Sequence, residues 1–107
     1  VGIVEAQRGT LTHHYWTDKK GLVTKANIIV GTTNNNAAIT MSIKKAAQGL
    51  IKKGVTVTDG ILNMIEMAFR AYDPCFSCAT HSLPGQMPMI VLIRDSQGNE
   101  IQRISRK

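Results

Sequence analysis

The chain has 107 residues, of which 43% are hydrophobic and only 5% are aromatic. This is enough for about one small domain with a modest core, and no apolar run reaches the roughly 18 residues of a membrane-spanning helix. The formal net charge of +6 raises nucleic acid as a possible partner, but the lysines form separate pairs without interleaved aromatic residues, as on an ordinary solvated surface. We therefore expect no nucleic-acid partner and no membrane span.

The two cysteines are too few for a disulfide scaffold, and a free pair fits a reducing compartment. The first residues also lack the basic region and apolar core of a secretion signal. These features predict a cytoplasmic protein. Because the chain begins with Val1 rather than Met, we expect a segment of a longer polypeptide or a processed piece.

The first thirty residues predict strands. Residues 1–18 alternate loosely between apolar and polar side chains with a break at Gly9, which indicates two short strands around a turn or bulge. Residues 18–21 form a turn signal, and the β-branched run 22–30 is expected to pair back as a hairpin. The following Gly-Thr-Thr-Asn-Asn-Asn run at 31–36 predicts a loop that ends in a helix N-cap at one of the asparagines.

Two amphipathic helices are predicted next. From residue 37 onward apolar side chains fall on one helical face, and Gly54 is expected to close this first helix. The second helix should begin at Thr58, as N-cap, with Asp59 in its first turn, and Pro74 should terminate it.

The rest of the chain completes an α+β fold. Breaker residues fill 82–88, and residues 89–94 and 99–105 predict two strands around a turn at 95–98. The predicted order is thus an N-terminal β-hairpin, two amphipathic helices, a metal-binding loop and a C-terminal β-hairpin extension.

The metal-binding loop is the run Asp-Pro-Cys-Phe-Ser-Cys-Ala-Thr-His at residues 73–81. Cys75 and Cys78 can converge on one soft metal ion within a single turn, and His81 can approach from the same side. A redox dithiol is less favoured, because it prefers a helix N-terminus and this pair is predicted to follow a helix C-terminus. A structural zinc site remains open if His13 or His14 supplies a fourth ligand.

Other polar residues have ordinary interpretations when taken singly. Arg8 could be a surface arginine paired with Glu5, and Thr32 and Thr33 could be helix caps.

Taken together, three blocks in this order resemble the C-terminal part of the large subunit of nickel-iron hydrogenases. They are the Glu-Ala-Gln-Arg-Gly run at 5–9, the Gly-Thr-Thr-Asn-Asn run at 31–35, and the Asp-Pro-Cys-x-x-Cys-x-x-His run at 73–81. The resemblance spans essentially all 107 residues. The residues of the last block are most similar to those of the cytoplasmic, bidirectional branch of the family, which is linked to NAD(P) or F420. The resemblance also implies that the chain is part of a larger, mainly helical subunit.

The resemblance implies the reversible heterolytic cleavage of dihydrogen. In the family, four cysteine thiolates hold nickel, and two of them bridge to an iron that carries carbon monoxide and cyanide. By position, Cys75 would be a terminal nickel ligand and proton acceptor, and Cys78 would be a bridge. Arg8 would lie over the open metal face, oriented by Asp73 through a charge-assisted hydrogen bond, so that Arg8, Asp73 and Cys75 form the catalytic set.

Further ligands and partners follow from the same resemblance. Arg8 and Thr32 would donate to the cyanides, and His81 would bind a separate magnesium or iron ion. Partners would be the rest of the large subunit with its N-terminal Cys-x-x-Cys, a small subunit with iron-sulfur clusters, maturation chaperones and an endopeptidase. Residues 1–81 would be the hydrogenase part, and residues 82–107 would be the extension that the endopeptidase removes, so the chain is expected to be an unprocessed precursor.

Two features depart from the family pattern. Gln7 stands where the family usually has proline, which loosens the backbone before Arg8. The second Cys-x-x-Cys is absent from this chain, so the four-thiolate site must be completed from elsewhere. Two alternatives are therefore kept: a noncatalytic module with structural zinc, and a hydrogenase-like subunit for assembly or electron transfer.

Overall fold

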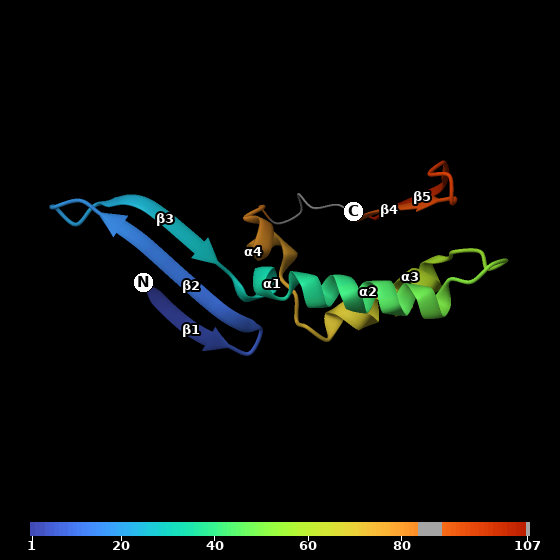
Figure 1. The fold of residues 1–107 in the computed structure, drawn as a ribbon, viewed down its shortest axis with the longest axis horizontal. Helices are drawn as coiled ribbons and strands as arrows, with labels where there is room; N and C mark the ends of the chain where they lie inside the picture. Colours follow the sequence, from blue (N-terminus) through green and yellow to red (C-terminus); the bar gives the residue numbers. More distant parts are fainter. Residues whose placement is uncertain (84–88, 107) are drawn as a thin grey trace.

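The computed structural model describes residues 1–83 and 89–106, and the molecule is elongated, measuring 64 × 25 × 25 Å (Figure 1). Its elements, in chain order, are β1 (Gly2–Ala6), β2 (Gly9–Thr17), β3 (Val23–Ile29), α1 (Gly31–Asn34), α2 (Asn36–Leu50), α3 (Asp59–Arg70), α4 (Phe76–Thr80), β4 (Met89–Arg94) and β5 (Glu100–Arg106). The α+β class is therefore confirmed. Within the described residues, no helix has the length and apolar character needed to cross a lipid bilayer.

The N-terminal strands form a three-stranded antiparallel sheet in the order β1-β2-β3. The first turn is a two-residue loop at residues 7–8, because Ala6 pairs with Gly9. The predicted turn after β2 is confirmed, and the Asp18 side chain stabilises it by accepting from the backbone N–H groups of Lys20 at 2.8 Å and Leu22 at 3.0 Å.

The predicted loop at 31–36 is wrong, because its first residues form the short helix α1. Figure 1 shows α1 between the sheet and α2, and α1 contacts both β2 and α4. Gly31 and Thr32 are buried in these contacts. The asparagine side chains do not cap α2: Asn35 precedes it without a side-chain cap. Tertiary contacts have overridden the local preference for a loop.

The two predicted amphipathic helices, α2 and α3, are confirmed and pack against each other. Thr58 caps α3 as predicted, accepting from the Ile61 N–H at 3.4 Å. Helix α2 ends at Leu50 rather than at Gly54, because Ile51 already adopts an extended backbone. The buried apolar side chains lie in and beside this helix pair: Ile39, Val57, Leu62 and Ile65.

The C-terminal strands β4 and β5 form the predicted antiparallel hairpin, a sheet separate from the first one. Met89, Val91 and Ile93 are the less exposed residues of β4, alternating with exposed ones. Met89 and Val91 line an apolar cavity of about 290 Å³ together with residues of α2 and α3, such as Ile43 and Ile65. The hairpin thus faces the helix pair across this cavity.

Candidate functional site

The cysteine motif is not the loop that was predicted, because Cys75 directly precedes α4 and Cys78 lies within it. The Cα atoms of the two cysteines are 5.3 Å apart, since residues three apart on a helical turn share one face. The sulfurs are joined in a disulfide, whereas the sequence predicted free thiols. The same proximity that allows a disulfide also lets two thiolates chelate one ion.

The position of this pair also corrects the argument against a redox dithiol. The two cysteines do not follow the C-terminus of a helix but lie at the start of a helix of their own. The preceding helix, α3, already ends at Arg70, and Asp73 adopts a left-handed backbone with φ of 49° immediately before Pro74. This unusual conformation redirects the chain between α3 and α4.

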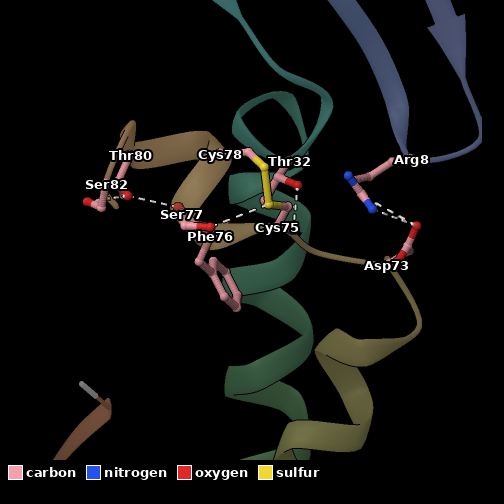
Figure 2. Close-up of a disulfide and its surroundings, with 9 residues drawn as sticks. All are labelled: Arg8, Thr32, Asp73, Cys75, Phe76, Ser77, Cys78, Thr80 and Ser82. Carbon is pink, nitrogen blue, oxygen red and sulfur yellow. Dashed lines mark hydrogen bonds and ion pairs between the residues drawn. A yellow bond between two sulfur atoms is a disulfide. The ribbon is translucent and has the colours of Figure 1, made fainter. Parts of the chain in front are cut away.

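Thr32 connects α1 to the cysteine motif. The residue is only 3% exposed, and its hydroxyl oxygen accepts a hydrogen bond from the Cys75 N–H at 3.0 Å (Figure 2). It is therefore not the ordinary helix cap considered from the sequence. On the other side of Cys75, the Ser77 hydroxyl lies 3.6 Å from the Cys75 sulfur. The backbone and the sulfur of Cys75 are thus both held by hydroxyl groups.

Arg8 contacts Asp73, not its neighbour Glu5. Its Nε donates to Asp73 Oδ2 at 3.3 Å, and its Nη2 lies 3.2 Å from the same oxygen (Figure 2). The two side chains are 40% and 56% exposed in this chain, so solvent screens their attraction and the pair adds little stability. The main effect of this contact is to orient the Arg8 side chain, because it fixes the position of the guanidinium group.

Three further residues place the Arg8 turn, and the sequence did not single them out for this role. A Cβ atom on Gly31 would lie 3.1 Å from both Arg8 O and Gly9 Cα, so the turn passes α1 at a distance that only glycine permits. Asn35 Nδ2 donates to Arg8 O at 2.8 Å, and Asn34 Nδ2 donates to Thr10 O at 3.0 Å. In the sequence, only the Gly-Thr-Thr-Asn-Asn motif at residues 31–35 indicated that this segment could belong to the site.

These contacts enclose a cavity of about 180 Å³ between the sheet turn, α1 and α4. Arg8, Thr32 and Cys78 line it, together with Gly9, Leu11, Val30 and Gly31. Four of the predicted site residues therefore gather in one place: Arg8, Thr32 and Cys78 at the cavity and Asp73 beside Arg8. Cys75 joins them through the disulfide and Thr32.

The histidines do not join this group. His81 is exposed and ends α4 with a left-handed backbone, φ 55°. His13 Nδ1 lies 2.6 Å from the Tyr15 hydroxyl, and the His14 ring lies 3.7 Å from the Trp16 ring, centroid to centroid. Residues 1–83 and 89–106 contain no cluster of three His, Cys, Asp or Glu side chains that could hold a metal ion. The four-ligand zinc site considered from the sequence is therefore not assembled.

Several hydrogenase subunits are similar in sequence to nearly the whole chain. It is 58% identical over 105 residues to a subunit of the F420-non-reducing hydrogenase of Methanothermobacter marburgensis, which covers 97% of this chain and 22% of the relative. It is 54% identical over 104 residues to an iron-sulfur subunit of the F420-non-reducing hydrogenase of Archaeoglobus profundus, covering 97% of this chain and 21% of the relative. For the beta subunit of the NAD-reducing hydrogenase HoxS of Cupriavidus necator, identity is 46% over 106 residues, covering 99% of this chain and 22% of the relative.

These names correct the more specific resemblance drawn from the sequence. The Archaeoglobus relative is named an iron-sulfur subunit, the Cupriavidus relative is named a beta subunit, and none of the three is named a large subunit. The assignment to the C-terminal segment of a large subunit is therefore not retained. The F420-linked branch is corrected as well, because two of these relatives are named F420-non-reducing.

A solved structure and a family model agree with the relatives. The crystal structure of an NAD⁺-reducing [NiFe]-hydrogenase in the H₂-reduced state matches with a TM-score of 0.69 and 51% identity, over 75% of this chain and 18% of that chain. The family model of nickel-dependent hydrogenases matches residues 1–81, which include the whole candidate site. The chain therefore belongs to the nickel-dependent hydrogenase family.

Proposed function

We propose that residues 1–81 supply half of the dihydrogen-activating centre of a hydrogenase, with Cys75 and Cys78 as two of its metal ligands. The observation that carries this proposal is the gathering of Arg8, Thr32 and Cys78 around one cavity, with Cys75 tied to Cys78. These residues come from three separate elements. The chain spans about 22% of the first relative, so the reaction of the whole enzyme is part of the proposal.

The donor set fits a soft metal. When reduced, two thiolates whose Cα atoms are 5.3 Å apart can chelate nickel, and thiolates are also able to bridge to iron. The bound metals would supply the Lewis acidity that polarises dihydrogen. The chain contains only these two cysteines, so the remaining thiolates must come from another part of the polypeptide or from a partner.

The other site residues would stabilise charge at the site and orient the groups around it. The planar guanidinium of Arg8 presents its donors in fixed directions, so its role would be electrostatic positioning at the cavity, with Asp73 as its anchor. Thr32 accepts from the Cys75 N–H and can still donate its own hydroxyl proton, which suits a polar diatomic ligand such as iron-bound cyanide. Cys75, as a terminal thiolate, would accept a proton at its sulfur.

The partners and the second ion complete the proposal. His81 would bind magnesium or iron only with donors from outside this chain, since no described cluster surrounds it. Iron-sulfur clusters would be carried by a partner subunit, because such a cluster needs about four cysteine ligands. Chaperones and an endopeptidase would act before the site is complete, in a cytoplasmic setting.

We also propose that residues 82–107 are an extension that is removed in the active enzyme. Two observations support a boundary after His81: α4 ends there with a left-handed residue, and the family match ends there. The extension carries the separate β4–β5 hairpin. Mass analysis of the active, nickel-containing enzyme should find a C-terminus at residue 81, and an active enzyme that retains residues 82–107 would refute the extension's removal.

One competing function has an observation in its favour. The Archaeoglobus profundus relative is named an iron-sulfur subunit, and the Cys75–Cys78 pair could supply two ligands of an iron-sulfur cluster that lies between chains. In that case the chain would serve electron transfer and Arg8 would be a structural residue.

Metal analysis with infrared spectroscopy of the intact native complex tests these functions. The proposed function predicts nickel, iron in excess of nickel because the partner's clusters also contain iron, carbon monoxide and cyanide bands, and loss of nickel in Cys75→Ala but not in the control Thr56→Ala at an exposed residue. Nickel and diatomic bands that persist in Cys75→Ala, together with a loss of iron and acid-labile sulfide, would favour electron transfer. Stoichiometric zinc without those bands would favour a noncatalytic module.

A further inference from the structure

We infer that Asn35 is a positioning residue for Arg8, holding the Gln7–Arg8 turn at the cavity. This inference rests on the proposed function, since it assigns Asn35 to the same site. It also explains how Arg8 keeps its place in a chain that has glutamine where proline would stiffen the turn.

The Gln7–Arg8 turn does not have the backbone conformation that two-residue hairpin loops usually adopt. Two-residue hairpin loops prefer turns in which the backbone has positive φ, because these match the twist of the strands. Among the described non-glycine residues only Asp73 and His81 have positive φ, so neither Gln7 nor Arg8 does. The positive φ at this turn belongs to the following Gly9, at 134°, so the two central residues lack the preferred conformation and contacts from outside add support.

Helix α1 and the residues after it provide this support. Asn35 Nδ2 donates to the Arg8 carbonyl at 2.8 Å in a partly buried contact, while Asn34 Nδ2 donates to the Thr10 carbonyl at 3.0 Å. Gly9 and Gly31 approach each other between these bonds, with a Cβ on Gly31 only 3.1 Å from Gly9 Cα. The sheet turn is thus clamped at two carbonyls and one backbone contact.

Asn35 has the more direct effect on Arg8. Its hydrogen bond orients the peptide group that follows the Arg8 Cα atom, and this limits the directions in which the Arg8 side chain can leave the backbone. From this position the guanidinium reaches Asp73, 65 residues further along the chain (Figure 2). Without the clamp, the exposed Arg8–Asp73 pair alone would have to hold the turn.

Proline at position 7 offers a specific rescue. A negative φ at Gln7 is compatible with proline, which favours the first central position of such a turn. The preceding residue, Ala6, ends strand β1, and an extended backbone is what proline requires of the residue before it. Gln7→Pro should therefore stiffen the turn without using Asn35.

The test uses the intact hydrogenase that contains this chain, with five variants: Asn35→Ala, Arg8→Lys, Asn35→Ala combined with Gln7→Pro, Asn35→Ala combined with Arg8→Lys, and the control Asn36→Ala. Asn36 is the exposed neighbour in sequence. Amide hydrogen exchange of residues 8–10, nickel content and kcat are measured for each. Exchange reports the turn directly and does not depend on catalysis.

Asn35→Ala should raise exchange at residues 8–10 and lower kcat by about tenfold to a hundredfold, with nickel content unchanged. Gln7→Pro should restore most of the lost kcat and protection, and Asn36→Ala should match the unmodified enzyme. Adding Arg8→Lys to Asn35→Ala should cost no more than Arg8→Lys alone, because Asn35 acts through Arg8.

Unchanged exchange in Asn35→Ala would overturn the inference, whatever Arg8→Lys does. Full additivity of the two substitutions in kcat would also overturn it, because Asn35 would then act independently of Arg8. If exchange rises but Arg8→Lys alone keeps full turnover, the proposed role of Arg8 fails, and Asn35 is left as a structural clamp and not a positioning residue for catalysis.

Discussion

The Arg8 turn and the turn between β4 and β5 each join two antiparallel strands, yet they are held in opposite ways. In the second, Asp95 Oδ1 accepts from the backbone N–H groups of Gln97 at 2.9 Å and Asn99 at 2.8 Å, and Oδ2 accepts from Asn99 Nδ2 at 3.1 Å. Every bond lies within five consecutive residues. This turn carries its own stabilisation, as does the Asp18 turn.

The Arg8 turn depends on residues far away in sequence. Asn34 and Asn35 donate to it from 24 and 27 residues away, and Asp73 holds the Arg8 side chain from 65 residues away. The difference shows that the β4–β5 turn can form locally, whereas Arg8 reaches its place only after the sheet, α1 and the chain before α4 have come together. The position of a residue proposed for catalysis thus depends on tertiary structure and not on its own turn.

The largest effect is expected for Arg8→Lys, which should slow dihydrogen turnover by about two or more orders of magnitude while the metals stay bound. A lysine keeps the charge but cannot donate through both Nε and Nη2 to Asp73. The matched control is Arg70→Lys, since Arg70 pairs with Glu66 within α3. Turnover assays with nickel analysis check both variants, and an Arg8→Lys enzyme with normal turnover would remove Arg8 from the mechanism.

Gly31→Ala should break the packing on which the Arg8 turn depends. The new Cβ would lie 3.1 Å from backbone atoms of Arg8 and Gly9, which cannot move aside cheaply, so we expect a loss of about 2–3 kcal/mol in unfolding free energy. Gly49→Ala is the control, because its Cβ would meet nothing within 4 Å and alanine favours the helix by about 0.5–1 kcal/mol. Urea unfolding of the polypeptide measures both, and equal midpoints for the two variants would contradict the close approach.

The same division between local and distant contacts explains what the sequence could predict. Helix α3 was predicted because Thr58 caps it locally and its apolar residues repeat at helical spacing. The turn at Asp95 was predicted because its hydrogen bonds lie within the turn. In both cases neighbouring residues determine the structure.

The short helices were missed for the opposite reason. Helix α1 has only four residues, and Thr32 is buried against parts of the chain that are distant in sequence, including Cys75, which donates to it from 43 residues away. Local preference in the Gly-Thr-Thr-Asn-Asn-Asn run favours a loop. For the candidate site, the motifs identified Arg8, Thr32, Asp73 and the cysteines, but the roles of Gly31 and Asn35 follow from distances that no pattern in a single sequence shows.

Thr32→Val tests the link between α1 and the cysteine motif. Valine has nearly the same shape but no hydroxyl, so the Cys75 N–H would lose its acceptor at a part-buried position, and we expect a loss of about 1–2 kcal/mol. Thr32→Ser should retain most of the stability, and Thr33→Val, at the exposed neighbouring residue, should have little effect. Urea unfolding again provides the measurement. If Thr32→Val and Thr33→Val were equally stable, the hydrogen bond to Cys75 would contribute nothing.

The smallest effect is expected at the self-contained turn, and it should depend on pH. Hydrogen bonds from Asn99, first from its backbone and then from its side chain, together with those from Gln97 and Gly98, hold the pKa of Asp95 below its ordinary value. A lowered pKa in the folded hairpin means that the stabilisation is present above the ordinary pKa of an aspartate, about 3.9, and is lost as the pH falls through the folded value.

Asp95→Asn should therefore reduce amide protection of residues 97–99 near neutral pH, because a neutral amide is a weaker acceptor than a carboxylate. In acid the Asp95 carboxyl is protonated, so protection in the original chain should fall toward that of the variant. Hydrogen exchange at neutral and at acidic pH measures this, with residues 8–10 as the internal reference.

Protection at residues 8–10 should be the same in the original chain and in the variant at each pH, because the Arg8 turn is held from α1 and not by Asp95. A loss at 97–99 that is equally large in acid would contradict the carboxylate's role, and a parallel loss at 8–10 would contradict the independence of the two turns.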